Sequence, residues 1–192
     1  MTLLGADILP VAVARDAEAA LLERARRMDA DAWDDLYSTH YAAIFRYCSL
    51  RISDPETAED LAADVFLEAV KGIERYRYRG TPFRAWLYRI AHNLTADERR
   101  ARIRRGAVDA APTAAEEPRE RDFAPAVQSR QDFETALARL TGDQQQVVIL
   151  RFIEGLSLAE TAVAMERPAG AIKALQFRAT RRLRALLEGE VG

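Results

Sequence analysis

The feature that most restricts the fold of this chain is a central stretch that cannot form a core. Residues 106–126 contain Pro112, Pro118 and Pro125, many alanines and mixed charges, but few large apolar side chains. Such a segment buries too little apolar surface to offset the conformational entropy that is lost when it becomes ordered. We therefore predict a flexible linker over 106–128. The 192 residues then form two small units, and each unit needs its own hydrophobic core.

Both units show helical periodicity. Leu61, Val65 and Ala69 recur every four residues, and comparable apolar spacings run through 32–48 and 129–187. No run of alternating apolar and polar residues indicates a β-strand. The predicted fold is therefore all-α, with two small helical domains joined by the linker and a helix-turn-helix in the second domain. The predicted segments are an N-terminal extension (1–20), an N-terminal helical domain (21–105), the linker (106–128) and a C-terminal domain (129–192).

Charge is strongly segregated along the chain, although the formal net charge is only −2. Residues 54–68 hold six acids and no base, whereas residues 75–105 hold ten arginines against two acids. Residues 167–184 hold six cations and no acid. This pattern indicates a protein that contacts a basic partner through one surface and an anionic polymer through two others. The common alternative for any such run is a solvated charged face.

The sharpest local motif lies near the C-terminus and has the pattern of a helix-turn-helix. Ser157 and Glu160 form a capping box that starts a short helix, and Pro168 suits the first turn of a second helix. The inward residues of that second helix are predicted to be Ile172 and Leu175. An α-helix fits the major groove of B-DNA, where outward side chains read base edges and flanking arginines bind phosphates. The DNA-contacting candidates are Arg167, Lys173, Ala174, Phe177, Arg178, Arg181 and Arg182. The other interpretation of this segment is a plain helical hairpin with a basic surface.

A second motif interleaves aromatic residues and arginines over 75–93. Arginines neutralise phosphates, and aromatic faces stack on exposed bases at about 1–3 kcal/mol per base. Gly80 and Pro82 shape a loop that can approach an unpaired base. We therefore predict contact with single-stranded nucleic acid, with burial in the core as the strongest alternative for Trp86. The candidates are Arg77, Tyr78, Arg79, Arg84, Trp86, Tyr88, Arg89, Asn93 and Arg100.

The sequence offers little that suits catalysis. His40 and His92 have no partners at metal-ligand spacing, and the single cysteine, Cys48, cannot form an internal disulfide or a thiolate cluster. No phosphate-binding glycine loop, nucleophile motif or paired-carboxylate site is evident. No apolar run approaches the roughly 20 residues that cross a bilayer. We expect a non-enzymatic protein of the reducing cytoplasm, with no cofactor, no bound metal and no membrane insertion.

Three motifs, in this order along the chain, resemble the extracytoplasmic-function (group IV) RNA polymerase sigma factors. Residues 59–67 (EDLAADVFL) are similar to the polymerase-binding helix of that family, and residues 83–93 (FRAWLYRIAHN) are similar to its −10 recognition helix. Residues 143–152 (DQQQVVILRF) resemble the start of its C-terminal domain. The resemblance covers about Leu21 to Leu187. Three motifs in the right order, separated by a linker, are far more specific than any one of them.

The resemblance implies a mechanism and a set of partners. The N-terminal domain would bind the clamp helices of the β′ subunit of core RNA polymerase, through Glu59, Asp60, Asp64 and Phe66. The aromatic-arginine candidates would contact the −10 element of the promoter DNA as it melts. The helix-turn-helix candidates would read the −35 element as duplex, and the C-terminal domain would touch the β-subunit flap. An anti-sigma factor would be a further partner.

The chain departs from the family pattern at several positions. Residues 62–64 are Ala-Ala-Asp where the family usually has Thr-Gln-Glu, which keeps an acid but loses an amide. The turn of the helix-turn-helix carries Glu166 where glycine is common, and a left-handed conformation of this residue would cost about 1 kcal/mol. Residues 174–176 also differ from those of many relatives, so the family's promoter preference does not carry over.

Two other functions stay open at the level of sequence. A one-component helix-turn-helix regulator with a helical sensor domain would need a palindromic duplex site, a dimer interface and a ligand pocket. A protein-interaction module would leave both basic blocks merely solvated. The aromatic-arginine block favours the sigma factor, because a reader of duplex DNA has little use for stacking residues.

Overall fold

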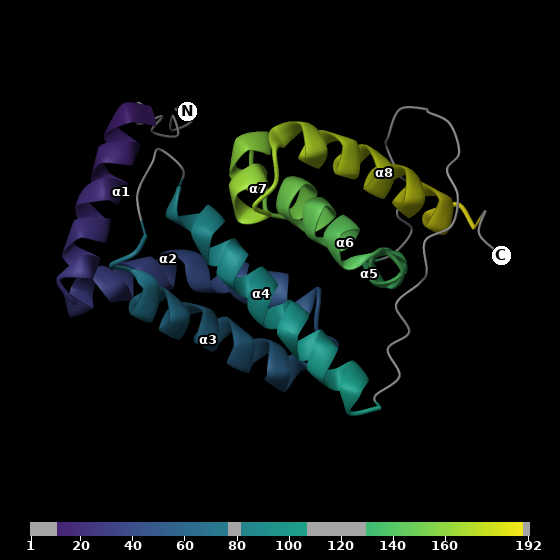
Figure 1. The fold of residues 1–192 in the computed structure, drawn as a ribbon, viewed down its shortest axis with the longest axis horizontal. Coiled ribbons are helices and arrows are strands. Elements are labelled where there is room, and N and C mark those ends of the chain that lie inside the picture. The colour runs from purple at the N-terminus through teal and green to yellow at the C-terminus, as the bar shows by residue number, and fades with distance from the viewer. Residues whose placement is uncertain (1–10, 77–81, 107–129, 190–192) are drawn as a thin grey trace, which may run out of the picture.

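The computed structural model of the chain describes residues 11–76, 82–106 and 130–189. Every regular element within these ranges is a helix, which confirms the predicted all-α class (Figure 1). None of the helices in these ranges is both long and apolar enough to cross a membrane. The predicted linker, apart from Gly106, and the candidates Arg77, Tyr78 and Arg79 lie outside the described residues.

The N-terminal domain consists of α1 (Val11–Arg26), α2 (Ala30–Ser49), α3 (Pro55–Gly72) and α4 (Phe83–Arg104). Aspartates start two of these helices: Asp29 accepts a hydrogen bond from the amide of Ala32, and Asp54 accepts one from the amide of Thr57. Each bond satisfies a backbone N–H group that the first turn of a helix leaves without a partner. Pro55 stands in the first turn of α3, where the missing N–H of proline removes no intrahelical hydrogen bond.

The core of this domain lies where α3 packs against α2 and α4. Val65 and Ala69 of the predicted apolar stripe are fully buried, and Phe83 and Leu87 of α4 are buried with them. The stripe is continuous because residues three and four positions apart share one face of a helix.

Helix α1 runs through the predicted domain boundary at residue 20 and contacts the rest of the domain. Glu18 accepts a hydrogen bond from the amide of Phe83 at 2.9 Å, at the start of α4. Arg26 donates to the carbonyl oxygen of Tyr76 at 2.6 Å. One helix therefore holds both described ends of the chain that joins α3 to α4.

The C-terminal domain consists of α5 (Arg130–Ala138), α6 (Gly142–Val148), the π-helix η1 (Ile149–Ile153), α7 (Leu158–Ala164) and α8 (Ala169–Leu187). A capping box formed by Thr141 and Gln144 starts α6, and the predicted box of Ser157 and Glu160 starts α7. Helix α8 packs across α5, α6 and α7, and closes the core of the domain.

The two domains lie side by side, with α4 packed along α7 (Figure 1). Helix α8 lies on the side of the C-terminal domain that is away from α4 (Figure 1). The buried Arg51 connects the two domains, because it donates to Thr95 Oγ1 at 3.2 Å and to the carbonyl oxygen of Gly142 at 3.1 Å. These hydrogen bonds compensate the cost of burying its charge.

Candidate nucleic-acid interface

One face of α8 is open to solvent. Ile172 and Leu175 are buried in the core, as predicted, and Ala179 and Leu183 continue the same stripe. The opposite side, called here the α8 face, consists of the exposed residues Lys173, Ala174, Phe177 and Arg178. A basic helix with one aromatic side chain and a firmly packed inner side has the form of a major-groove recognition helix.

The flanking arginines differ in their surroundings. The guanidinium of Arg181 lies over the ring of Phe177, 5.6 Å from its centre, which orients both side chains. Arg182 is half-buried on α8. Arg167, just before α8, forms an ion pair with Asp143 of α6. Its charge is therefore partly compensated within the domain.

The turn between α7 and α8 contains a strained residue. Glu166 has a φ of 51°, which is a left-handed conformation. Glycine is common at this position in the family that the sequence resembles, and glycine adopts this conformation without strain. For a residue with a side chain this conformation costs about 1 kcal/mol or more. The carboxylate of Glu166 contacts the N-terminal domain, where it accepts a hydrogen bond from Arg89 Nη1 at 2.9 Å.

The structure divides the α4 candidates into buried and accessible residues. Trp86 and Tyr88 are buried, with only 7% and 3% of their surface exposed. Asn93 and Arg100 are exposed, and Arg84 and Arg89 are half-buried between the domains. For Trp86, burial in the core is the alternative that the sequence leaves open. Its indole stacks on the Tyr76 ring with centres 4.6 Å apart.

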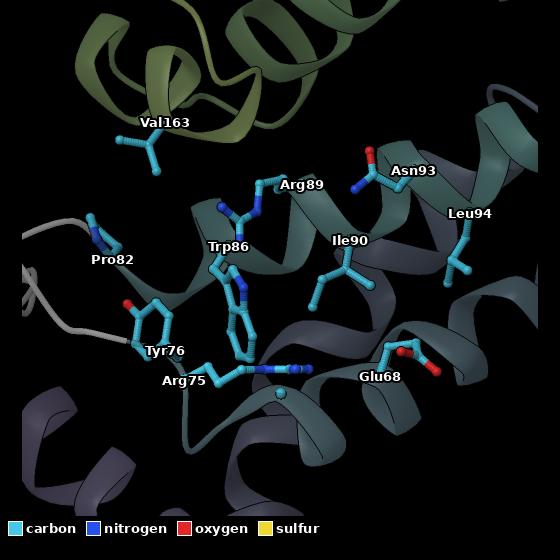
Figure 2. A pocket seen from close by; sticks show the side chains of 11 residues that line it. Glu68, Arg75, Tyr76, Pro82, Trp86, Arg89, Ile90, Asn93, Leu94 and Val163 are labelled. Atoms are coloured by element: carbon cyan, nitrogen blue, oxygen red, sulfur yellow. The ribbon is translucent and has the colours of Figure 1, made fainter.

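A cavity of about 720 Å³ lies beside α4 (Figure 2). Tyr76 and Trp86 form its aromatic wall, while Arg89 and Asn93 supply hydrogen-bond donors. Val163 of α7 faces it from the C-terminal domain (Figure 2). Aromatic faces combined with donors from arginine and asparagine can hold an unpaired base.

Polar contacts join α4 and its neighbours to the C-terminal domain over the length of α4. They include the pairs Arg46–Glu154, Tyr88–Glu154, Arg84–Glu160, Arg89–Glu166, Arg51–Gly142 and Arg99–Gln145. In each of these pairs the donor belongs to the N-terminal domain and the acceptor belongs to the C-terminal domain. The two facing surfaces are therefore electrostatically complementary.

The contacts between the two domains shift the pKa values of the groups that take part in them. Burial and the neighbouring Glu154 carboxylate raise the pKa of the Tyr88 hydroxyl far above its ordinary value. The hydrogen bond to Glu154 raises the pKa of Arg46. Burial alone would raise the pKa of Glu160, but hydrogen bonds from Ser157 and Arg84 lower it below its ordinary value. Glu160 is therefore a carboxylate at neutral pH.

The acidic side of α3 carries the predicted polymerase-binding acids. Glu59, Asp60 and Asp64 are exposed, and the buried face of α3 lies opposite them. Phe66, the fourth candidate, is only 5% exposed and packs on the ring of Tyr37 with centres 4.8 Å apart. The helical period places Phe66 on the buried stripe, so its surface contributes to the core rather than to an exposed face.

Two exposed apolar residues near these acids were missed at the level of sequence. Tyr37 is 43% exposed and Leu67 is 55% exposed. The exposure of Leu67 could have been predicted from its position directly after Phe66, because that position lies off the buried stripe of α3. The exposure of Tyr37 could have been predicted in the same way, because its neighbour Leu36 occupies the core position.

Burial shifts the pKa values of both histidines and of the cysteine. Burial, followed by the charge of Arg84, lowers the pKa of His40 to about 4, and burial with nearby Arg51 lowers the pKa of His92 to about 4. Burial raises the pKa of the Cys48 thiol to about 12. Among the residues that the structure describes, no three His, Cys, Asp or Glu side chains gather where they could hold a metal ion.

Two family models match the chain. Sigma-70 region 2 matches residues 36–105, and Sigma-70 region 4 matches residues 136–185. Helices α3 and α4, with most of α2, therefore correspond to region 2 of a sigma factor, and the helix-turn-helix that includes α8 corresponds to region 4. Helix α1 lies outside both matches.

Two similar proteins of known family identify the kind of sigma factor to which the chain is related. The ECF RNA polymerase sigma factor BldN of Streptomyces coelicolor is 39% identical over 170 residues, which are 87% of this chain and 64% of BldN. The ECF RNA polymerase sigma factor SigD of Mycobacterium tuberculosis is 33% identical over 180 residues, which are 86% of this chain and 81% of SigD. The chain belongs to the extracytoplasmic-function RNA polymerase sigma factors, as its three motifs predict.

A solved structure supports the arrangement of the helices. The sigma factor RpoE of Bartonella quintana, in complex with the anti-sigma factor NepR, is 26% identical to this chain with a TM-score of 0.63. The match covers 81% of this chain and 96% of RpoE.

Proposed function

We propose that this chain binds core RNA polymerase, recognises the −10 and −35 elements of a promoter and promotes DNA melting for transcription initiation. The observation that carries the proposal is the exposed, basic α8 face on a helix-turn-helix within region 4. The chain acts in the cytoplasm, as a DNA-binding factor without catalytic activity of its own.

The proposal is tested by adding the chain to core polymerase on a set of promoter templates. We expect selective opening and transcription of some templates that depends on the core enzyme. A dimer that binds a palindromic duplex and needs no core polymerase would support the one-component regulator instead.

The docking surface for polymerase consists of the exposed side of α3 together with Tyr37 of α2, which packs on Phe66 of α3. Glu59, Asp60 and Asp64 supply negative charge, and the exposed Tyr37 and Leu67 supply apolar contact area. The partner of this surface is the clamp-helix region of the β′ subunit. Interfaces of this kind combine a hydrophobic centre with charged groups that steer association.

Reversing the charge of Asp60 and Asp64 together, by Asp60→Arg and Asp64→Arg, is expected to weaken core polymerase binding by at least about tenfold. Both side chains are exposed, so the fold has no need of their charges. Binding is measured by fluorescence anisotropy at low and high salt, since charge contacts weaken as salt rises. Asp34→Arg with Asp35→Arg is the matched control, because it makes the same charge change on exposed positions of α2. Equal affinity of the two double variants would refute this docking surface.

The −35 element is bound through the α8 face. Arg178→Ala is expected to cost about 1–3 kcal/mol of duplex binding and to relax base preference, because an arginine in the major groove binds a guanine edge through two hydrogen bonds. Arg182→Ala is expected to weaken binding without a change in preference, as loss of a phosphate contact does. Selection of bound sequences from a random duplex library measures both effects. The assignment fails if Arg178→Ala leaves affinity and preference untouched.

The −10 element is bound by the accessible α4 residues and by the candidates at 77–79. Asn93 and Arg89 border the cavity beside α4, which is suited to a base that has left the duplex. An anti-sigma factor is a further proposed partner, and the RpoE complex with NepR supports it. An anti-sigma factor would then compete with core polymerase and promoter DNA for the two domains, with the β-subunit flap of the polymerase contacting the C-terminal one.

A further inference from the structure

The C-terminal domain presents three glutamates to the N-terminal domain, and these are called here the acidic strip: Glu154, Glu160 and Glu166. Glu160 Oε1 accepts hydrogen bonds from Arg84 Nε at 2.9 Å and from Arg84 Nη2 at 2.7 Å. Glu166 Oε1 accepts one from Arg89 Nη1 at 2.9 Å. Carboxylate oxygens here occupy the arginine donors that DNA phosphates would occupy.

Glu154 is the most enclosed member of the strip, with 2% of its side chain exposed. Its two oxygens accept from Arg46 at 2.7 and 2.6 Å, and Oε2 also accepts from the Tyr88 hydroxyl at 2.8 Å. A buried carboxylate with three donors is fully satisfied only while the two domains are in contact. Separation of the domains would leave the Tyr88 hydroxyl without this acceptor, while the ring packs against Tyr47 of its own domain.

Glu166 shows that this contact has a cost within its own domain. The residue adopts a φ of 51°, which glycine would adopt without strain. Glycine would have no carboxylate for Arg89, however. A residue with a strained backbone whose side chain makes a specific contact across the domain boundary is typical of a functional position rather than of a simple turn.

The closed arrangement is selective, because it covers only one of the two candidate DNA surfaces. Helix α4 packs along α7, whereas α8 lies on the far side of the C-terminal domain (Figure 1). The α8 face stays exposed.

We propose that the acidic strip is an intramolecular competitor of promoter DNA, which holds the basic side of α4 closed in the free protein and leaves the α8 face open. The inference rests on the proposed assignment of α4 to the −10 element and of α8 to the −35 element. The chain in its closed form can bind duplex DNA through α8, but it cannot engage an unpaired strand through Arg84, Tyr88 and Arg89 until the strip releases them.

Domain separation is measured first, without DNA or polymerase, by resonance energy transfer between dyes on Ser38→Cys and Thr135→Cys. Both positions are exposed, one in each domain, and Cys48 is fully buried. High transfer is expected at low salt, and lower transfer at high salt, since ion pairs are screened. The triple variant Glu154→Gln, Glu160→Gln and Glu166→Gln should show low transfer at both salt concentrations. Glutamine preserves the capping box at residue 160, because its amide oxygen can still accept from the Ser157 amide.

The binding of two DNA probes is then compared: a mixed-sequence single strand and a duplex of the same sequence. The triple variant should bind the single strand about fivefold to thirtyfold more tightly than wild type, which corresponds to about 1–2 kcal/mol. Its affinity for the duplex should match that of a charge control. This control is Asp16→Asn with Asp34→Asn and Asp35→Asn, which removes the same number of negative charges at exposed positions of the N-terminal domain. Equal transfer in wild type and triple variant, or equal gains for variant and control, would overturn the proposal.

Two further variants distinguish loss of the interdomain contact from loss of folding. Glu166→Gly should raise Tm, because it removes backbone strain, and should lower energy transfer at the same time. Arg89→Glu combined with Glu166→Arg should restore the transfer that either change alone reduces. If energy transfer behaves as expected but the chain supports no core-dependent transcription, the proposed function fails and the closed form stands. If transcription succeeds while the strip variants leave energy transfer unchanged, only the competitor role fails.

Discussion

Trp86→Ala is expected to lower the free energy of unfolding by about 3–5 kcal/mol. The indole is 7% exposed, stacks on Tyr76 and lies 5.4 Å from Phe83 between ring centres. Removing it opens a void that the surrounding helices fill only in part, which adds a cavity term to the lost burial. Urea denaturation followed by circular dichroism measures the change.

The control for this prediction is Phe177→Ala, which removes an aromatic ring that is 40% exposed. It should cost less than about 1 kcal/mol, since surface truncations rarely exceed that value. The contrary result for Trp86→Ala would be unchanged stability combined with poor promoter opening. Trp86 would then belong with the DNA-contacting residues rather than with the core.

Replacing Tyr78, Arg79 and Asn93 together by alanine is expected to reduce promoter opening by at least about tenfold, because each stacked base is worth about 1–3 kcal/mol. The variant should still fold, bind core polymerase and bind the −35 duplex. Asn93 is exposed on α4 beside the cavity, and the other two positions lie in the chain that leads to α4. Permanganate reactivity of unpaired thymines on a linear promoter reports the opening directly.

Two comparisons sharpen this experiment. Arg104→Ala removes an exposed charge at the end of α4 and should leave opening near the wild-type level. A template with a pre-melted bubble should rescue a defect in strand separation but not a defect in reading exposed bases. If the triple variant opens the linear promoter as well as wild type, the aromatic-arginine block is a solvated basic face and the proposed melting role is wrong.

The parts of the site that were predictable are those that depend on neighbouring residues. The buried stripe of α8 follows from its 3–4 residue spacing, which in turn places Lys173 and Arg178 on the outer face. The same spacing places Phe66 inward, and its assignment to a polymerase contact came from the family motif rather than from the helix. Glycine-like geometry at residue 166 was anticipated from the turn, but the partner of its carboxylate was not.

Local sequence was sufficient for the helices, their caps and the segregation of charge, because a helix, a capping box or a charged face involves residues within a few turns of one another. Whether Trp86 and Tyr88 are buried or exposed depended on packing between helices. Both residues have apolar and basic neighbours in the sequence, so the sequence alone fits either outcome. The pairing of arginines with the acidic strip depended wholly on how the domains meet. Arg84 and Glu160 are 76 positions apart, and Arg46 and Glu154 are 108 apart. No periodicity links such positions, so only the packing of α4 against the C-terminal domain brings their charges together.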